Sequence, residues 1–274
     1  MEDSAVSVRP AALRFEGFAV NTRLVRRIAS PLVILLAWQI GSMTHVIPAT
    51  KLAAPTTILA TFWSLLLSGE LVNDLLVSLS RVAVGLILGV AIGTGLGLLA
   101  GLSSLGDDAI DPPMQSLRTL PYLGMAPLLI LWFGIGELPK IALVAFASAF
   151  PIYMTLLGGI RSVDPKLIEA AKVFGLNRAQ TIRAVILPGA LAPALIGLRY
   201  SLGAAWLSLV VSEQINADSG IGHMIMDARD FLRTDIIVVG LLVYAILGLA
   251  TDAIVRLVEK RALAWRPSIL KEGA

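Results

Sequence analysis

Long apolar stretches, interrupted by short polar segments, make up most of the 274-residue chain. At 1.5 Å of rise per residue, six of these stretches are long enough to form a helix across the roughly 30 Å hydrocarbon core of a bilayer. The pattern therefore predicts an all-α, polytopic membrane protein with a transmembrane domain over residues 30–258. Its six transmembrane helices are expected at residues 30–47, 80–104, 114–134, 140–160, 190–212 and 236–257.

The segments around these stretches are of several kinds. Residues 55–67 are apolar but too short to span and contain a tryptophan, so we expect a helix at the membrane interface. Residues 106–113 and 213–234 are polar and are expected to form a break and a loop. Prolines at membrane depth need neighbours or water to satisfy the freed carbonyls. Pro121 and Pro127 therefore place the third stretch inside the bundle.

Five glycines recur every fourth residue along the second stretch. Glycines at this spacing lie on one helix face and let another helix backbone approach closely, which is how helices associate in lipid. A fixed packing contact and a sliding interface both fit the pattern. The glycines are Gly85, Gly89, Gly93, Gly97 and Gly101.

The polar segment between the fourth and fifth stretches has complete helix start and stop signals. Asp164 is a typical N-cap, Pro165 a typical first helical residue, and Gly175 a typical residue just past a helix end. A second short helix is expected from Asn177 until Pro188 stops it. Helices this short cannot cross a bilayer, so the sequence places this segment, about residues 161–189, outside the membrane.

The basic residues set the predicted orientation. With the N-terminus inside, sixteen Lys and Arg lie in inner segments and four in outer ones, with Arg81 and Arg199 at or within spans. This asymmetry predicts that both termini and segment 161–189 are cytoplasmic. Residues 1–29 are then a cytoplasmic arm and not a cleaved signal, and residues 259–274 are a cytoplasmic tail. The net charge of +3 is thus a topology signal and not a nucleic-acid signal.

The composition indicates a membrane protein, and no group of residues in the sequence supports catalysis by this chain. Hydrophobic residues make up 57% and charged residues 15%, outside the range of soluble globular proteins. The chain has no Cys and two separated His, so no metal site is expected. It contains no Gly-x-x-x-x-Gly-Lys-Ser/Thr phosphate loop. Energy for any active process must therefore come from a partner or from a gradient.

The first helix of the polar segment carries an apolar stripe. Leu167, Ala170, Ala171 and Phe174 recur at helical spacing, and the two alanines keep one face thin. Such a stripe is typical of a helix inserted into a groove of a partner. A solvated connector between two spans is the simpler alternative, and the pattern alone does not decide between them.

The residues of this segment resemble a known signature. Glu169-Ala170-Ala171, then Gly175, then Ile186-Leu187-Pro188, are similar to the EAA motif of binding-protein-dependent ABC importer permeases. Five other stretches resemble the nitrate/sulfonate/taurine branch of that family, and residues 227–235 are most similar to the aliphatic sulfonate permease. The resemblance covers about residues 30–267 and leaves the N-terminal arm unexplained. The five stretches are 78–82, 120–121, 131–135, 150–153 and 216–222.

The resemblance implies a type I ABC importer permease fold in a bacterial plasma (inner) membrane. It also implies a homodimer, two ATP-binding subunits on the cytoplasmic face that hydrolyse ATP with magnesium, and an external substrate-binding protein. The chain itself would bind no cofactor, would not be an enzyme, and would carry a small organic anion, an alkanesulfonate. Taurine, nitrate or another small solute is the alternative cargo within the family. The alternative outside the family is a gradient-driven transporter. That class predicts paired acidic residues inside the spans, whereas Asp252 is the one acidic residue that lies clearly within a predicted span.

In the family, this segment is the coupling helix that docks into a cleft of the ATPase. The resemblance assigns Glu169 as the polar anchor, Gly175 as the turn that aims the helix, and Pro188 as a rigid exit into the fifth span. Nucleotide-driven closure of the ATPases would then move the two coupling helices together and turn the bundle from inward-open to outward-open. The expected ATPase-coupling residues are Glu169, Ala170, Ala171, Phe174, Gly175, Leu187 and Pro188.

Polar and aromatic residues of the fifth span are candidates for the translocation pathway. Arg199 lies within that span, where a charge is a functional candidate by default, although an ion pair inside the bundle would also explain it. A carboxylate would repel a sulfonate, so we expect Glu213 to order the gate or to pair with an arginine. Arg81 is expected to pair with Asp74. The full candidate set is Arg199, Trp206, Ser208, Ser212, Glu213 and Gln214.

Overall fold

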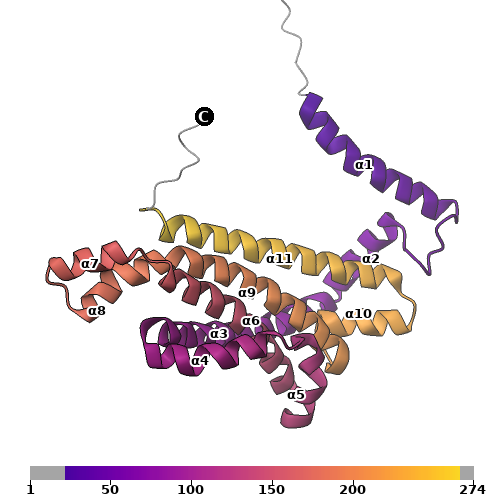
Figure 1. Cartoon of the computed structure of the whole chain (residues 1–274). Coiled ribbons are helices and arrows are strands. Elements are labelled where there is room, and N and C mark those ends of the chain that lie inside the picture. Colours follow the sequence, from indigo (N-terminus) through magenta and orange to yellow (C-terminus); the bar gives the residue numbers. More distant parts are fainter. Residues whose placement is uncertain (1–21, 266–274) are drawn as a thin grey trace, which may run out of the picture.

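The computed structural model describes residues 22–265, apart from the side chains of residues 22–28 and of Asn216. Most of the predicted N-terminal arm and the end of the predicted tail lie outside these residues. The described part is helical and has no strand. Four long helices run side by side along the molecule (Figure 1). They are α3 (Glu70–Leu102), α6 (Glu137–Arg161), α9 (Leu187–Asn216) and α11 (Thr234–Ala262).

Within the described residues, four helices are long and apolar enough to cross a membrane. A fifth candidate is a broken pair, in which α4 (Ser104–Arg118) meets η1 (Tyr122–Met125) and α5 (Ala126–Phe133) at an angle of 89°. The predicted all-helical class is confirmed, but the count of six spans is not. The third predicted stretch, 114–134, is broken because Pro121 lies in the extended region at φ −70° and ψ 93°, where a helix cannot continue.

The first predicted span is also shorter than expected. Helix α1 (Thr22–Met43) has an apolar part, Ala29–Met43, that falls below the length of the other candidates. It leads away from the bundle and packs against α2 (Pro55–Leu67), where Gln39 Nε2 donates to Thr56 Oγ1 at 3.2 Å (Figure 1). Helix α2 confirms the predicted short helix. Its place at a membrane interface stays a prediction.

The glycine stripe of α3 forms a close contact with α6. A Cβ atom on Gly89 would lie 2.1 Å from Ser148 Oγ and 2.3 Å from the Ala145 carbonyl oxygen. On Gly93 it would lie 2.3 Å from the Ala149 carbonyl oxygen. The predicted close approach of backbones is therefore confirmed. The structure holds one packing of these helices, so the choice between a fixed and a sliding contact stays open.

Two segments predicted as polar breaks are helical instead. Residues 106–113 lie in α4, where Ser103 Oγ accepts from Gly106 N at 3.0 Å and caps the helix. Tyr153 Oη of α6 donates to Asp111 Oδ1 at 2.8 Å and ties α4 to the bundle, so tertiary contacts outweigh the two prolines in this helix. The predicted loop 213–234 contains α10 (Ile221–Asp230), which packs on α9 and α11.

Candidate coupling surface and buried charge network

Local signals define both ends of helix α7 (Pro165–Val173). Asp164 Oδ1 accepts from Lys166 N at 2.9 Å and caps its N-terminus. At the other end, Gly175 lies in the left-handed region at φ +78°, and its N–H donates to Lys172 O at 3.0 Å. Leu176 N donates to Ala171 O at 3.0 Å and completes a Schellman motif. The predicted helix and both of its boundary residues are confirmed.

The second short helix starts as predicted but does not stop at Pro188. Asn177 and Gln180 form a capping box at the start of α8 (Arg178–Thr181). Helix α8 then continues through η2 (Ile182–Ile186), a π-helix, into α9, so that residues 178–215 form one helix of 38 residues. Proline usually clashes with the carbonyl four residues earlier. The wider π-turn, which Leu187 N closes by donating to Ile182 O, precedes Pro188 and lets the helix continue.

An apolar groove of about 470 Å³ runs along α7 and brings several predicted coupling residues together. We call it the α7 groove. Glu169, Gly175 and Leu187 are exposed outside its lining. Trp265 was missed from the sequence, where it is only a lone aromatic residue in a basic tail. The lining residues are Leu167, Ala170, Ala171, Phe174, Leu176, Ala184, Val185, Pro188, Gly189 and Trp265.

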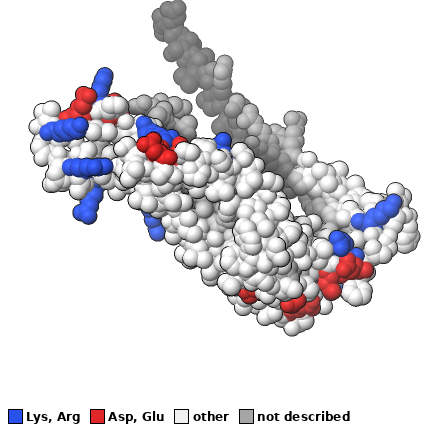
Figure 2. All heavy atoms as spheres, turned by 60° about the horizontal axis from the view of Figure 1, so that its bottom comes forward, with Lys and Arg blue, Asp and Glu red and all other residues white. Residues whose placement is uncertain are grey.

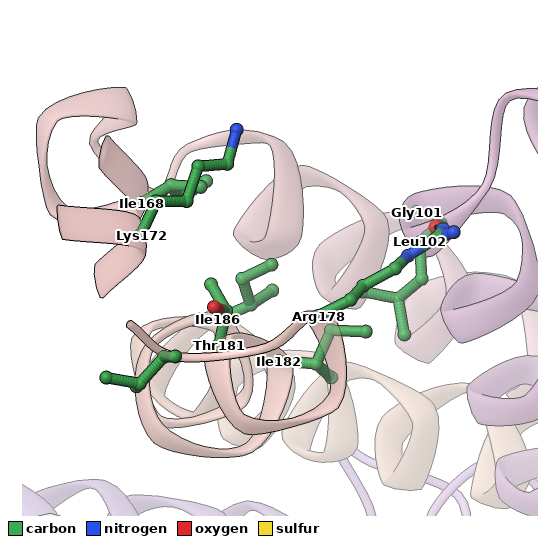
Figure 3. Close-up of a pocket in the computed structure, with 9 residues that line it drawn as sticks. Gly101, Leu102, Ile168, Lys172, Arg178, Thr181, Ile182 and Ile186 are labelled. Carbon is green, nitrogen blue, oxygen red and sulfur yellow. Dashed lines mark hydrogen bonds between the residues drawn. The ribbon is translucent and has the colours of Figure 1, made fainter. Parts of the chain in front are cut away.

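A second hollow of about 390 Å³ lies on another side of α7. Figure 3 shows Ile168 and Lys172 of α7 across from the residues of α8 and η2, with the end of α3 beside them. Arg178 Nη2 donates to Leu102 O at 2.7 Å and thereby caps the C-terminus of α3. Helix α7 is thus a ridge between two hollows. At 3.6 residues per turn, the face between them carries Glu169 and Val173.

This ridge ends in exposed apolar side chains. The side chains of Val173 and Phe174 are 86% and 82% exposed. The nearby polar residues Lys172 and Asn177 are exposed as well. Figure 2 shows Lys and Arg gathered at the α7–α8 end, a mostly uncharged band along the middle of the molecule, and further charged residues at the opposite end. An apolar tip outside the uncharged band is typical of a protein contact.

A buried charge network lies near the opposite end of the bundle. The side chain of Glu213 is fully buried, and its carboxylate accepts hydrogen bonds from four groups. The donors are Ser78 Oγ at 2.8 Å, Arg81 Nη1 at 2.8 Å, Gly222 N at 2.9 Å and Tyr244 Oη at 3.0 Å. The expectation that Glu213 pairs with an arginine is confirmed. This full set of partners leaves Glu213 no free acceptor for a cargo.

Arg81 extends this network to other elements. Its guanidinium donates to both oxygens of Glu137, at 2.5 and 2.7 Å, and to the Ser219 carbonyl oxygen at 2.6 Å. The predicted Arg81–Asp74 pair is wrong, because Asp74 accepts from Gly220 N at 2.9 Å instead. Seven residues of helix separate the two by about 10 Å along the axis, whereas the tertiary partners lie in contact. We call Ser78, Arg81, Glu137, Glu213 and Tyr244 the Glu213 network.

Arg199 is paired inside the described bundle. Its Nε lies 3.2 Å from Asp252 Oδ1, and its Nη2 donates to Glu259 Oε2 at 2.7 Å. This arrangement matches the ion-pair alternative weighed from the sequence. A role of Arg199 in the translocation pathway stays a prediction.

The remaining pathway candidates lie along α9. Trp206 is buried, and its Nε1 donates to Thr251 Oγ1 of α11 at 3.2 Å. Ser208 and Ser212 are buried and donate to carbonyls of their own helix, while Gln214 is half-buried. The structure thus spreads these residues over α9 and does not gather them into one cavity lining.

The sequence of this chain is similar to those of known transport proteins. Residues 93–263 match the family described as "Binding-protein-dependent transport system inner membrane component". The chain is 47% identical to the putative aliphatic sulfonates transport permease protein of Bacillus subtilis (strain 168), over 87% of this chain and 86% of that protein. The corresponding protein of Escherichia coli (strain K12) is 43% identical over 89% and 93%. The taurine transport system permease protein of Escherichia coli is 34% identical over 86% and 88%.

A solved structure shares the fold. The structure titled "Crystal structure of an amino acid ABC transporter with histidines" superposes with a TM-score of 0.61 at 22% sequence identity. The match covers 73% of this chain and 98% of that one.

Proposed function

We propose, from the premise that this chain belongs to the family of binding-protein-dependent transport system inner membrane components, that it carries alkanesulfonates and receives energy through α7. It is a permease of an ABC importer. Its relatives are permease subunits, which are not enzymes. The partners in this proposal are a second copy of the chain, two ATP-binding subunits and an external substrate-binding protein.

The observation that carries the coupling role is the exposed ridge of α7. Exposed apolar residues at a tip, a thin alanine face beside a groove, and rigid caps at both ends suit insertion into a cleft of another protein. We assign that cleft to the ATP-binding subunit, which would hydrolyse ATP with magnesium. Glu169, on the ridge, supplies the polar anchor, and Gly175 sets the direction of the tip.

The connections of α7 allow a direct transfer of motion. Helix α6 ends at Arg161, three residues before the Asp164 cap, and α8 continues without a break into α9. A displacement of α7 by the ATPase therefore acts on two spans at once. Two packings of these spans, one open to each side, would give alternating access. Pro188 lies within the continuous helix after the π-turn, so the π-turn is the local weak point for bending.

The cargo assignment rests on two relatives named for aliphatic sulfonates. Taurine, nitrate or another small solute is the alternative, since a more distant relative is named for taurine transport. Arg199 and Glu213 both have charged partners within the bundle. Much of the selection for a sulfonate anion would then reside in the external binding protein.

The test of coupling is uptake by proteoliposomes that contain the chain and its ATP-binding subunit, supplied with the binding protein. Glu169→Ala should lower ATP-dependent uptake about tenfold, with no change in the amount of folded protein. The matched control is Asp108→Ala, which removes an exposed carboxylate from α4 near the same end. Wild-type uptake by Glu169→Ala would refute the assignment.

The test of cargo is calorimetry on the purified binding protein. We expect it to bind alkanesulfonates. Binding of nitrate or another solute, with no affinity for alkanesulfonates, would refute the sulfonate assignment while leaving the coupling assignment intact.

A further inference from the structure

The turn between α10 and α11 exposes two large apolar side chains. Phe231 and Leu232 are 74% and 66% exposed, and they lie between the end of α10 and the start of α11. This turn is at the end of the molecule opposite to α7 (Figure 1). It is the counterpart of the apolar tip of α7, so each end of the bundle carries one.

Charged residues surround this turn. Arg229 Nη2 lies 3.1 Å from Asp230 Oδ1, and Arg233 Nη2 lies 3.0 Å from Asp235 Oδ2. The hydrogen bond to Asp235 raises the pKa of Arg233. Charges of this density belong outside the hydrocarbon core. Phe231 and Leu232 therefore face water beyond a polar rim, which is the anatomy of a protein interface.

The backbone at Leu232 adds an independent observation. Its φ is +55°, in the left-handed region that favours glycine. Leu232 N donates to Arg229 O at 3.0 Å and Arg233 N donates to Ala228 O at 2.7 Å, so Leu232 occupies the C′ position of a Schellman motif. Glycine would fill this position at lower cost. A strained leucine with an exposed side chain indicates that the side chain itself has a use.

Helix α10 is also held rigidly at its other end. The amide groups of its N-cap residue and of its first two residues donate to side chains of α3 and α9 that are buried in the bundle. Gly220 N donates to Asp74 Oδ1 at 2.9 Å, Ile221 N to Ser78 Oγ at 3.0 Å, and Gly222 N to Glu213 Oε2 at 2.9 Å. A fixed helix presents its far end in one position, which lowers the entropy cost of binding there.

We propose that Phe231 and Leu232 are the docking point for the external substrate-binding protein, which receives them in an apolar recess. This inference rests on the proposed function. The turn lies at the end of the long helices, away from their exposed apolar sides, which are the surfaces that suit lipid or another helix. The lipid core lies behind the charged rim. A water-soluble protein on the outer side is the occupant that both the exposure and the rim fit.

The experiment measures binding of the purified substrate-binding protein to the complete transporter in nanodiscs. The double variant Phe231→Ser, Leu232→Gly should weaken the affinity about tenfold or more. Leu232→Gly alone should weaken binding while leaving the melting temperature equal or higher, because glycine relieves the backbone strain. The control is Leu105→Ser, which changes an equally apolar side chain, 79% exposed, at the other end of the bundle.

The control variant should bind as the wild type does. Affinity of the double variant within twofold of the wild type would overturn the proposal. An equal loss in Leu105→Ser, or no binding to the wild-type transporter, would overturn it as well. Failure of the proposed function would be visible separately, as the absence of ATP-dependent uptake by the wild-type complex in proteoliposomes.

A location measurement distinguishes the possible occupants. The chain has no cysteine, so Phe231→Cys carries a single fluorescent label in this subunit. Its emission should shift to the blue when the substrate-binding protein is added, and a label on Leu105→Cys should not respond. A disulfide-linked homodimer of Phe231→Cys would point to a second copy instead. Strong quenching by brominated lipid would point to the membrane, and either result would overturn the proposal.

Discussion

Removal of the Glu213 carboxylate tests the buried network most directly. In Glu213→Ala, the Arg81 guanidinium loses its buried partner, and three other donors lose their acceptor. Removing one member of a buried ion pair costs about 3–5 kcal/mol. Arg81 keeps its two bonds to Glu137, which holds the cost within that range. For a chain of this size, such a loss corresponds to a fall in melting temperature on the order of 10 °C.

The amide variant gives the intermediate case. In Glu213→Gln, one oxygen remains as an acceptor, whereas the new NH₂ group faces the Gly222 amide, which is a donor. We therefore expect a loss of about 2 kcal/mol, smaller than for alanine. Asp218→Ala, which removes an exposed carboxylate in the following loop, should change stability by less than about 0.5 kcal/mol.

The assay is thermal unfolding of the purified chain in detergent, followed by loss of monodisperse protein. A second reading comes from the double variant Arg81→Met, Glu213→Leu. Because it removes both charges together, it should be less destabilised than the sum of the single variants, with a coupling energy of about 1–3 kcal/mol. A melting temperature for Glu213→Ala within about 2 °C of the wild type would refute the reasoning, as would strict additivity in the cycle.

Three further predictions concern the helix contact, the coupling turn and the orientation. Gly89→Ala places a Cβ 2.1 Å from a side-chain oxygen of α6 and should destabilise the chain by about 1–3 kcal/mol. Gly95→Ala, which has open space around its Cβ, should leave the stability unchanged. Equal melting temperatures of the two variants would contradict this prediction. Gly175→Ala adds a side chain at φ +78° and should cost about 1 kcal/mol and lower ATP-coupled uptake; unchanged uptake would argue against a role of the turn in aiming α7. In intact cells, a membrane-impermeant maleimide should label Asp230→Cys and not Asn177→Cys, and the reverse pattern would invert the proposed orientation.

Local chemistry explains what could be read from the sequence. The helix α7 was predicted with its boundaries because Asp164 and Gly175 act within a few residues of their own positions. The importer-permease family and the all-helical fold were also predicted, and both are confirmed. The glycine stripe predicted a close helix contact because its spacing alone places the glycines on one face. These features need no knowledge of distant neighbours.

The features predicted wrongly are those that residue type and spacing alone do not decide. Pro188 is a stop signal in isolation, but a π-turn in front of it lets the helix continue. Arg81 was assigned to Asp74, since a sequence offers only near partners, whereas its real partners are 56 and 132 residues away. The break at Pro121 was missed because a mean apolar composition does not reveal a change of direction.

The 38-residue helix over residues 178–215 has a consequence for the energetics of the whole transporter. At 1.5 Å per residue it measures about 57 Å, so the segment beside α7 and the carboxylate of Glu213 belong to one continuous helix. In the proposed mechanism, a partner that binds at the α7 end and a partner that binds at the Glu213 end both act on the tilt of this helix. By thermodynamic linkage, the factor by which binding of the proposed ATPase would change the affinity for a partner at the Glu213 end equals the factor for the reverse effect. Measuring either affinity therefore determines the coupling free energy for both.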